Sequence, residues 1–505
     1  MKILITQLAR FGDIYQSWPT IRAVKRKYPQ AEVHLLVRKR FAAALEGVGI
    51  ECTVHQMDTA HLLEPVYGVR TSTGASLRRL SEWVDRLGEI GFDEIINLSF
   101  SPFSSYLSRS LSRENTVVRG YTRFDDGFLA IPDDASAYFY AQVGVGRHNR
   151  VHLAELFASV AEVDVQDSDW TLLDYQRNPG QKDRIFESHE IPTRDPYLVL
   201  HVGASDSHKT LSAERWSATC RRLLQWWQGR IILVGSPSEV LIGQRILEGV
   251  CSSRVHSLVG KTRLSELFPL LSSARIVIGG DSVVMQMASL AQVECLNVSF
   301  PTVNFWETGP KEPGSRILLV GGSQAPNPES MAKEIWHLLE GLTPEGDVAF
   351  ATGESPVWFE HSGISANTEF SWDLIRAIYL GADFPAPPST LAVHGFHRIY
   401  ELAELAIAQI EVIHNEGARA VAAEILGQVD GLMGSVRRMV PDLDPLISWF
   451  ETEKIRIGPS SVVELAEQTR RIFESLKMVA SLYMGREGIG IHGLEEGHAD
   501  DNLVS

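Results

Sequence analysis

Two successive stretches of this chain alternate short apolar runs with amphipathic segments, and this alternation constrains the fold more than any other feature. In the first stretch, from residue 1 to about 173, the apolar runs predict strands and the amphipathic segments predict helices. The predicted strands cover residues 3–6, 32–37, 53–56 and 94–98, and the predicted helices cover 19–28, 77–90 and 151–163. Such an alternation is typical of a parallel sheet wrapped by helices.

The alternation starts again after a polar segment at 174–196, which contains Pro179, Pro192 and Pro196 and is expected to be a linker. The second stretch predicts strands at 197–201, 230–234, 275–279 and 294–299, and helices at 213–227, 238–249, 264–273, 284–291 and 331–339. Two doubly wound α/β units of similar size place a cleft between their strand ends, and such clefts commonly hold nucleotides.

The pattern changes after residue 341. A segment rich in Gly, Ser and Pro runs to residue 388 and predicts irregular structure with one short helix at 372–380, whereas residues 391–483 are helical in pattern almost throughout. We therefore expect two Rossmann-like domains at 1–178 and 179–342, a linker at 343–390, a helical module at 391–484 and a flexible acidic tail at 485–505.

Composition excludes some classes of protein. The 505 residues are too many for one core, and no apolar stretch approaches the length of a membrane span. The net charge of −16 argues against a nucleic-acid partner, although the basic run Arg38-Lys39-Arg40 leaves contact with a membrane surface open. The cysteines lack metal or redox spacing, and a strand that starts at the first residue would leave no room for a signal peptide, so a cytoplasmic protein is expected.

The opening turn holds the best candidate for a reactive group. The first predicted strand is followed by Arg10-Phe11-Gly12-Asp13 and then by helical spacing from residue 14 to 28, with Pro19 expected in the first helical turn. In open α/β sheets ligands bind at the carboxyl ends of strands, which is where this turn lies. From the spacing alone, Asp13 is either a helix cap or a catalytic carboxylate.

Several further motifs follow in order along the chain. They are Gly12-Asp13 with Pro19, Tyr28-Pro29-Gln30-Ala31-Glu32, His201-Val202-Gly203-Ala204-Ser205 before Lys209, Glu214-Arg215-Trp216, Gly235-Ser236-Pro237-Ser238-Glu239, Leu258-Val259-Gly260-Lys261-Thr262 with Leu264, and Gly280-Asp281-Ser282. In this order and spacing they resemble glycosyltransferase family 9, the heptosyltransferases that build the inner core of bacterial lipopolysaccharide. The resemblance covers about residues 1–339 and implies the GT-B fold, with an acceptor-side domain first and a nucleotide-sugar domain second.

The resemblance implies transfer of a sugar from ADP-L-glycero-D-manno-heptose with inversion, and it implies roles for individual residues. Asp13 would be the general base that takes the proton of the acceptor hydroxyl, and Lys209 would neutralise the leaving diphosphate. Backbone amides and a helix N-terminus would share that task without a metal, and Glu239 would contact the ribose. The residues expected to bind substrate or nucleotide are Gly12, Arg10, Ala204, Ser205, Glu239, Asp281, Ser282 and Val283.

Each of these residues also has a simpler explanation. Lysines are mostly solvated, which would account for Lys209, and Asp281-Ser282 could only cap the next helix. Glu239 could be an exposed glutamate in the first turn of a helix. The Asp167-Ser168-Asp169 sequence matches a metal-binding motif of the other major glycosyltransferase fold, but it is expected to be a solvated loop.

The sequence departs from the family at four positions. Val283 stands where a glycine is usual, Gln286 where a histidine is usual, Gln7 where an arginine is common, and Arg10 where a small residue is usual. A side chain at position 283 changes how closely the backbone can approach a phosphate. These departures leave two alternatives open: transfer from another nucleotide sugar, or a non-catalytic sugar-nucleotide-binding or scaffold protein.

These observations together predict an inverting, metal-independent glycosyltransferase that needs no cofactor. The expected donor is ADP-heptose, and the expected acceptor is a glycan, a lipopolysaccharide core or a protein. The expected location is the cytoplasm, including the cytoplasmic face of the inner membrane. An apolar face on the predicted helical module suggests a homo-oligomer.

Overall fold

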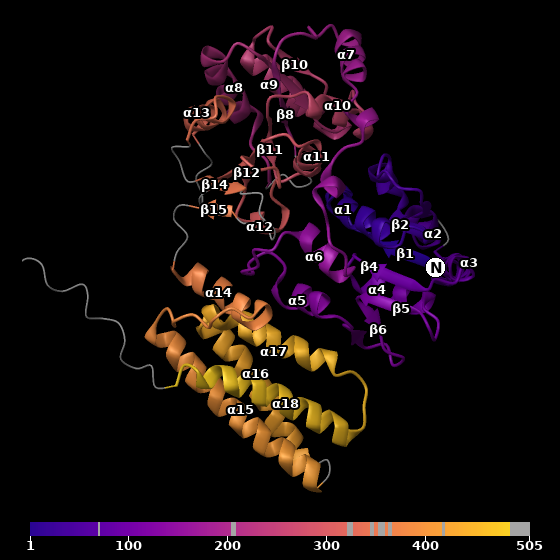
Figure 1. Cartoon of the computed structure of the whole chain (residues 1–505), viewed down its shortest axis with the longest axis vertical. Helices are drawn as coiled ribbons and strands as arrows, with labels where there is room; N and C mark the ends of the chain where they lie inside the picture. Colours follow the sequence, from indigo (N-terminus) through magenta and orange to yellow (C-terminus); the bar gives the residue numbers. More distant parts are fainter. Residues whose placement is uncertain are drawn as a thin grey trace, which may run out of the picture. The chain divides into compact units, whose positions relative to one another are not determined.

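A computed structural model of the chain describes residues 1–68, 71–203, 209–320, 327–343, 348–351, 359–361, 366–416 and 420–484. It divides into two compact units, Met1–Ile364 and Ser365–Ser505 (Figure 1). Ala204, Ser205 and the predicted tail at 485–505 lie outside the described residues.

The first unit begins with a five-stranded parallel sheet in the order β3-β2-β1-β4-β5, which we call the first lobe together with its helices. Its strands are β1 (Lys2–Thr6), β2 (Glu32–Arg38), β3 (Thr53–Met57), β4 (Glu94–Asn97) and β5 (Val117–Gly120), and β6 (Thr122–Arg123) and β7 (Leu129–Ala130) form a separate hairpin. The chain runs from β1 to one side and then returns to β4 on the other. The end of β1 is therefore the switch point at which open sheets bind ligands.

Helices surround this sheet. They are α1 (Phe11–Lys27), η1 (Lys39–Leu45), α2 (Thr59–Tyr67), α3 (Thr73–Gly88), α4 (Pro102–Leu111), α5 (Asp134–Gln142) and α6 (Leu153–Val160). One core cluster joins the sheet to α3 and contains Leu4, Leu36, Leu87 and Ile95, all buried. The four predicted strands of this lobe are confirmed.

The first helix begins earlier than predicted. α1 starts at Phe11, directly in the glycine turn, so Pro19 lies inside the helix and the prediction that it stands in the first turn is wrong. A proline inside a helix removes one backbone hydrogen bond. Every residue from Ile14 to Val24 is buried, and packing of that kind contributes more to helix stability than local propensity does.

The second lobe of the first unit is built on an eight-stranded sheet in the order β10-β9-β8-β11-β12-β13-β14-β15. Its strands are β8 (Tyr197–His201), β9 (Arg230–Val234), β10 (Val255–Ser257), β11 (Val277–Gly280), β12 (Cys295–Ser299), β13 (Arg316–Leu319), β14 (Val348–Ala351) and β15 (Phe359–His361). Strands β8 to β13 are parallel, and β14 and β15 are added antiparallel. Here the order reverses between β8 and β11, which makes their ends the second switch point.

The helices of the second lobe are α7 (Pro179–Ser188), α8 (Ala213–Trp226), α9 (Val240–Val250), α10 (Leu267–Ser272), α11 (Val283–Ala291), α12 (Phe305–Thr308) and α13 (Pro328–Leu339). Helix α7 lies in the segment expected to be a linker, and that expectation is corrected. Asn178 caps α7 by accepting a hydrogen bond from Gly180 N at 3.0 Å, and Pro179 takes the first helical position. The prolines of this segment thus include a helix start as well as turns.

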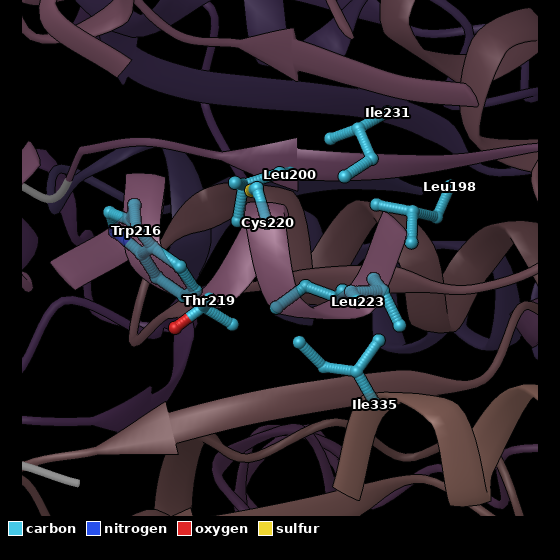
Figure 2. Close-up of a pocket in the computed structure, with 9 residues that line it drawn as sticks. Leu198, Leu200, Trp216, Thr219, Cys220, Leu223, Ile231 and Ile335 are labelled. Carbon is cyan, nitrogen blue, oxygen red and sulfur yellow. The ribbon is translucent and has the colours of Figure 1, made fainter. Parts of the chain in front are cut away.

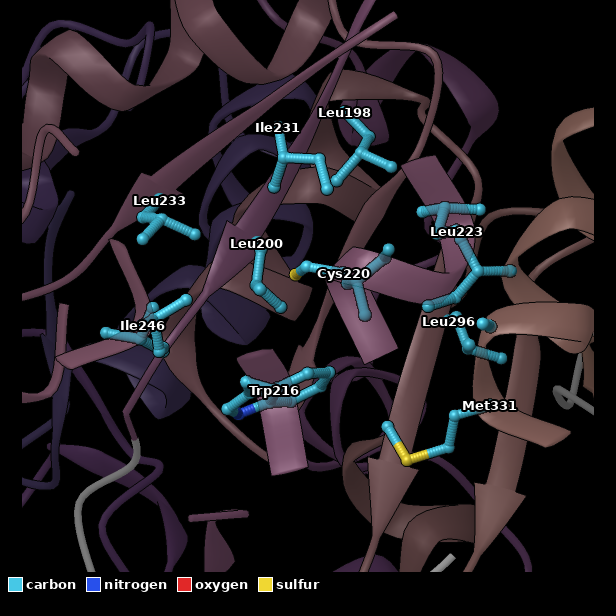
Figure 3. Packing of buried hydrophobic residues seen from close by; sticks show 14 of the residues in the cluster. Leu198, Leu200, Trp216, Cys220, Leu223, Ile231, Leu233, Ile246, Leu296 and Met331 are labelled. Carbon is cyan, nitrogen blue, oxygen red and sulfur yellow. The ribbon is translucent and has the colours of Figure 1, made fainter. Parts of the chain in front are cut away.

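The core of the second lobe packs α8 against the sheet (Figure 3). Trp216, Cys220 and Leu223 of α8 meet Leu200 of β8, and Ile335 of α13 closes the same layer. A small pocket opens among these residues (Figure 2), with a volume of about 10 Å³. A single water molecule needs about that much room, so this pocket is a packing gap and not a ligand site.

The second unit is helical. Its helices are α14 (Ala366–Leu380), α15 (Thr390–Glu416), α16 (Ala420–Met439), α17 (Asp444–Arg456) and α18 (Val462–Ser481). Figure 1 shows α15, α16 and α18 running lengthwise beside one another. Phe396 of α15 stacks on Tyr483 just beyond α18 at a centroid distance of 3.7 Å, and both are fully buried. Among the described helices of the chain, none is long and apolar enough to cross a membrane.

Candidate active site

The turn after β1 places Asp13 in the first turn of α1. The backbone N–H of Arg10 donates to Asp13 Oδ2 at 2.9 Å, and the hydroxyl of Ser17 donates to the Asp13 carbonyl at 2.7 Å. Asp13 therefore does help to cap its helix. The positive end of the helix dipole also stabilises a carboxylate in this position. Capping the helix does not prevent Asp13 from accepting a proton.

The surroundings of Asp13 change its acidity. Burial raises the pKa of the Asp13 carboxyl, while the hydrogen bond from Arg10 and the charges of Arg10 and Arg38 lower it by a smaller amount. Arg38 lies at the end of β2 and donates to the Ala9 carbonyl at 3.2 Å. The net result is a pKa above the ordinary value for aspartate.

If Asp13 is the general base that the family resemblance implies, this shift predicts the pH dependence of the transfer reaction. A general base must be deprotonated, so raising its pKa moves the loss of activity on acidification to higher pH. We expect the acid limb of kcat/KM to lie above the ordinary aspartate pKa of about 3.9, and to depend on Asp13. A pH–rate profile of the wild-type enzyme measures this limb, and a limb at or below that value would contradict the prediction.

Asp281 follows β11 directly and is held by three donors. Asn297 Nδ2 donates to Asp281 Oδ1 at 2.8 Å, the hydroxyl of Ser299 lies 3.3 Å from both carboxylate oxygens, and Phe300 N lies 3.4 Å from Oδ2. Burial raises the pKa of the Asp281 carboxyl, and these donors together with the charge of Lys209 oppose that rise. Asp281 is thus fixed to the end of β12 as well as to its own strand.

Helix α11 begins immediately after Asp281. Ser282 is its N-cap residue and Val283 its first residue, and both are half-buried. The Ser282 hydroxyl is buried and has no hydrogen-bond partner among the described residues. An uncapped helix N-terminus with a spare hydroxyl is a suitable place for an anion.

Lys209 lies beside this helix start. A Cβ added to Gly280 would stand 2.5 Å from the Lys209 carbonyl oxygen, so the backbone of Lys209 packs directly on the end of β11. Its charge is close enough to Asp281 to oppose the rise in the pKa of that carboxyl. The structure therefore brings Lys209, Asp281 and Ser282 together at the second switch point.

Glu239 stands in a first helical turn, that of the short 3-10 helix η5 (Pro237–Glu239), as the simpler explanation expects, but it is half-buried. Its Oε2 accepts a hydrogen bond from Ser236 N at 2.6 Å, and its carboxylate lies over the ends of β8 and β9. A Cβ on Gly203 would stand 1.8 Å from Glu239 Oε1, and a Cβ on Gly235 would stand 2.7 Å from Oε2. The two glycines therefore leave room for this carboxylate.

The two lobes meet at the turn that carries Asp13. A Cβ on Gly12 would stand 3.9 Å from Gln286 Cγ of α11, and Gln16 Nε2 donates to the Glu307 carbonyl of α12 at 3.4 Å. Further along α1, the Trp18 ring lies 5.6 Å from the ring of Phe268. The start of α1 thus lies against α11, the helix whose N-terminus is formed by Asp281-Ser282.

Sequence reasoning missed two residues at this contact. Gln286 Nε2 donates to the Thr308 carbonyl at 2.5 Å, so the glutamine that replaces the usual histidine is used to join α11 to α12. Gln7 is buried below the Asp13 turn. The contacts from Gln286 to Thr308 and from Gln7 to Leu98 join residues that are distant in the sequence, so no local pattern indicates them.

The expectation for the Asp167–Asp169 motif is corrected in part. Asp167 and Ser168 are exposed, as expected for a solvated loop. Asp169 differs, because it is buried, pairs with Arg26 at 2.8 Å and accepts a hydrogen bond from Gln166 N at 2.8 Å. Within the described part of the chain, no group of three or more His, Cys, Asp or Glu side chains is placed to hold a metal.

Comparison with known proteins shows which family this chain resembles. The family model described as glycosyltransferase family 9 (heptosyltransferase) matches residues 82–297, which include β4, the whole β8–β11 region and the Asp281 site. The chain is similar to the heptosyltransferases of glycosyltransferase family 9 over this region. Among curated relatives, lipopolysaccharide heptosyltransferase 1 from Campylobacter coli is 21% identical over 289 residues, covering 56% of this chain and 79% of the relative.

A solved structure supports the fold of this chain. The crystal structure of a family 9 glycosyltransferase from Veillonella parvula matches with a TM-score of 0.51 and 18% identity, covering 67% of this chain and 97% of that one. The predicted GT-B architecture with additional C-terminal helices is confirmed. A structure of E. coli heptosyltransferase WaaC with ADP-2-deoxy-2-fluoro heptose, 17% identical with a TM-score of 0.46, covers 68% of this chain and 99% of that one.

Proposed function

We propose that this chain transfers a heptose from ADP-heptose to a hydroxyl group of an acceptor glycan, with inversion and without a metal. The observation that supports the proposal is the contact between Gly12 at the start of α1 and Gln286 of α11, because it brings the turn that carries Asp13 against the helix that follows Asp281-Ser282. A base on one lobe and an anion site on the other are what an inverting transfer requires.

The reaction would proceed in one displacement. The acceptor oxygen forms a bond to the anomeric carbon while the bond from that carbon to the diphosphate oxygen breaks, and the hydroxyl proton passes to the Asp13 carboxylate. The α11 N-terminus, the Ser282 hydroxyl and Lys209 would stabilise the charge that develops on the departing ADP. Glu239, fixed over Gly203 and Gly235, would accept hydrogen bonds from the ribose hydroxyls.

The same assignment places the acceptor side in residues 1–178 and the donor side in residues 179–342. The donor identity is supported by the heptosyltransferase description of the matching family and of the Campylobacter coli relative. We propose a lipopolysaccharide core, another glycan or a protein as acceptor. The basic run Arg38-Lys39-Arg40 would bind the anionic cytoplasmic face of the inner membrane. The apolar face of the helical unit would support self-association.

A transfer assay tests this proposal. The full chain is incubated with ADP-heptose and with lipopolysaccharide that lacks heptose, and released ADP is measured with incorporated sugar. We expect one ADP per sugar transferred, and far less release with UDP- or GDP-sugars. Tight ADP binding without release of ADP for any acceptor extract would instead identify a non-catalytic sugar-nucleotide-binding protein.

A further inference from the structure

We propose that Gln7 is a positioning residue for Asp13, holding the turn that carries the catalytic carboxylate. The inference rests on the proposed function, since it assigns Gln7 a part in that reaction. Gln7 lies just after β1 and is 3% exposed. Its main-chain N–H continues the sheet by donating to the Leu36 carbonyl at 2.9 Å.

The Gln7 side chain joins three elements. Its Nε2 donates to the Leu98 carbonyl at the end of β4 and to the Ser17 hydroxyl in α1, both at 3.1 Å, and its Oε1 accepts from Ala9 N at 3.2 Å. The orientation of the amide is fixed, because a carbonyl only accepts and a backbone N–H only donates. Both protons of Nε2 are used, so the amide is saturated as a donor.

Ser17 transmits this contact to Asp13. Its hydroxyl has one proton, which it donates to the Asp13 carbonyl at 2.7 Å, while its oxygen accepts from Gln7. The Asp13 carboxylate itself accepts a hydrogen bond from Arg10 N at 2.9 Å. Gln7 thus fixes the turn on both sides of the carboxylate, through Ala9 before it and through Ser17 after it.

The turn after β4, where Gln7 donates to the Leu98 carbonyl, has an unusual backbone conformation. Phe100 has a φ of +45°, a left-handed conformation that is rare for a bulky residue, and the preceding Ser99 accepts a hydrogen bond from Leu8 N at 2.7 Å. The turns after β1 and β4 are therefore tied together at the first switch point. Such strained backbone is retained where the surrounding structure determines it strongly, often at functional sites.

Glutamine is the residue type that this position requires. The arginine common in the family has no acceptor for the Ala9 N–H, and glutamate would place a carboxylate against the Leu98 carbonyl. Leucine has a similar volume but would leave a buried N–H and a buried carbonyl without partners. The distance between Asp13 and the substrate would then no longer be fixed.

The test compares two buried glutamines. Gln176 is 6% exposed and also joins two main-chain groups, accepting from Leu173 N at 2.8 Å and donating to the Gly47 carbonyl at 3.1 Å, but it has no link to the Asp13 turn. Gln7→Leu and Gln176→Leu are measured side by side for kcat, for KM of ADP-heptose and for hydrogen exchange of the peptide that covers residues 8–13. Ser17→Ala serves as a milder variant if Gln7→Leu does not fold.

We expect Gln7→Leu to lower kcat by about 100-fold, which is the cost typical of misplacing a catalytic group by about 1 Å. The KM for the donor should stay within about twofold of wild type because the donor side is unchanged. Exchange in residues 8–13 should accelerate in Gln7→Leu and Ser17→Ala but not in Gln176→Leu. Equal losses of kcat in the two leucine variants, or unchanged exchange in residues 8–13, would overturn the inference. An inactive wild type would count against the proposed function, and the exchange measurement would still decide the role of Gln7.

Discussion

Replacing Asp13 with asparagine is expected to lower kcat by about 1,000-fold while leaving the affinity for ADP within about twofold of wild type. Asparagine has the same shape, and its side-chain oxygen can still accept the hydrogen bond that Arg10 N donates to Asp13. The turn should therefore keep its geometry and lose only the proton acceptor. Steady-state kinetics with ADP-heptose, together with ADP titration by calorimetry, measures both quantities.

Asp133 provides the matched control. It also caps a helix in the first lobe, accepting from Ser136 N at 2.7 Å and from Gly120 N at 2.9 Å. Asp133→Asn removes a carboxylate from a helix start without touching the Asp13 turn. The asparagine oxygen can still accept the capping bond from Ser136 N, whereas the bond from Gly120 N is lost because the amide NH2 only donates. Asp133→Asn should leave kcat unchanged. An Asp13→Asn enzyme as active as Asp133→Asn would show that Asp13 is only a helix cap.

The second large effect is expected for Gly203→Ala. The new methyl group would stand 1.8 Å from Glu239 Oε1 and 2.1 Å from Glu239 Cδ, so the carboxylate must leave its place over the ends of β8 and β9. Loss of a hydrogen bond to a charged group costs about 1.5–3 kcal/mol, which corresponds to ADP binding weaker by about 10- to 100-fold. Calorimetric titration with ADP measures this change.

Two further variants test whether displacement of Glu239 causes the weaker ADP binding of Gly203→Ala. Gly427→Ala lies in α16, where an added Cβ meets no described atom within 4 Å, and it should raise stability slightly because alanine favours helix. Adding Glu239→Ala to Gly203→Ala removes the clash. The double variant should therefore have a higher Tm than Gly203→Ala alone, but its affinity for ADP should stay below that of wild type. If the double variant bound ADP as tightly as wild type, Glu239 would have no part in nucleotide binding.

The regular elements around the site could be predicted because their signals are local. β1, β8 and β11 are short apolar runs, and each is followed by glycine or a carboxylate where the chain turns. The start of α1 and the helix α7 were misjudged because proline was taken as a boundary in one case and as a turn in the other. β14 was missed because its few residues are stabilised by pairing with β13, which no local pattern reveals.

The site itself could be predicted only in part. A carboxylate after a glycine turn indicates a helix cap or a base. The structure shows that Asp13 accepts a capping bond and that the preceding Gly12 lies against Gln286 of α11. The contacts that decide its geometry connect Gln7 with Leu98 and Gly12 with Gln286, pairs that are remote in sequence. Likewise, the fit of Glu239 over Gly203 depends on how β8 and β9 pair.

The central claim is that the strand ends of the second lobe bind the diphosphate of an ADP-sugar. Thermal unfolding of the full chain in the presence of different nucleotides tests this claim most directly. A ligand at 100 times its Kd adds about 2.7 kcal/mol of stability. We predict that ADP and ADP-heptose raise the Tm more than UDP or GDP do, and that Lys209→Ala removes most of the rise. No shift with any nucleotide diphosphate or nucleotide sugar, or an ADP shift unaffected by Lys209→Ala, would contradict the account.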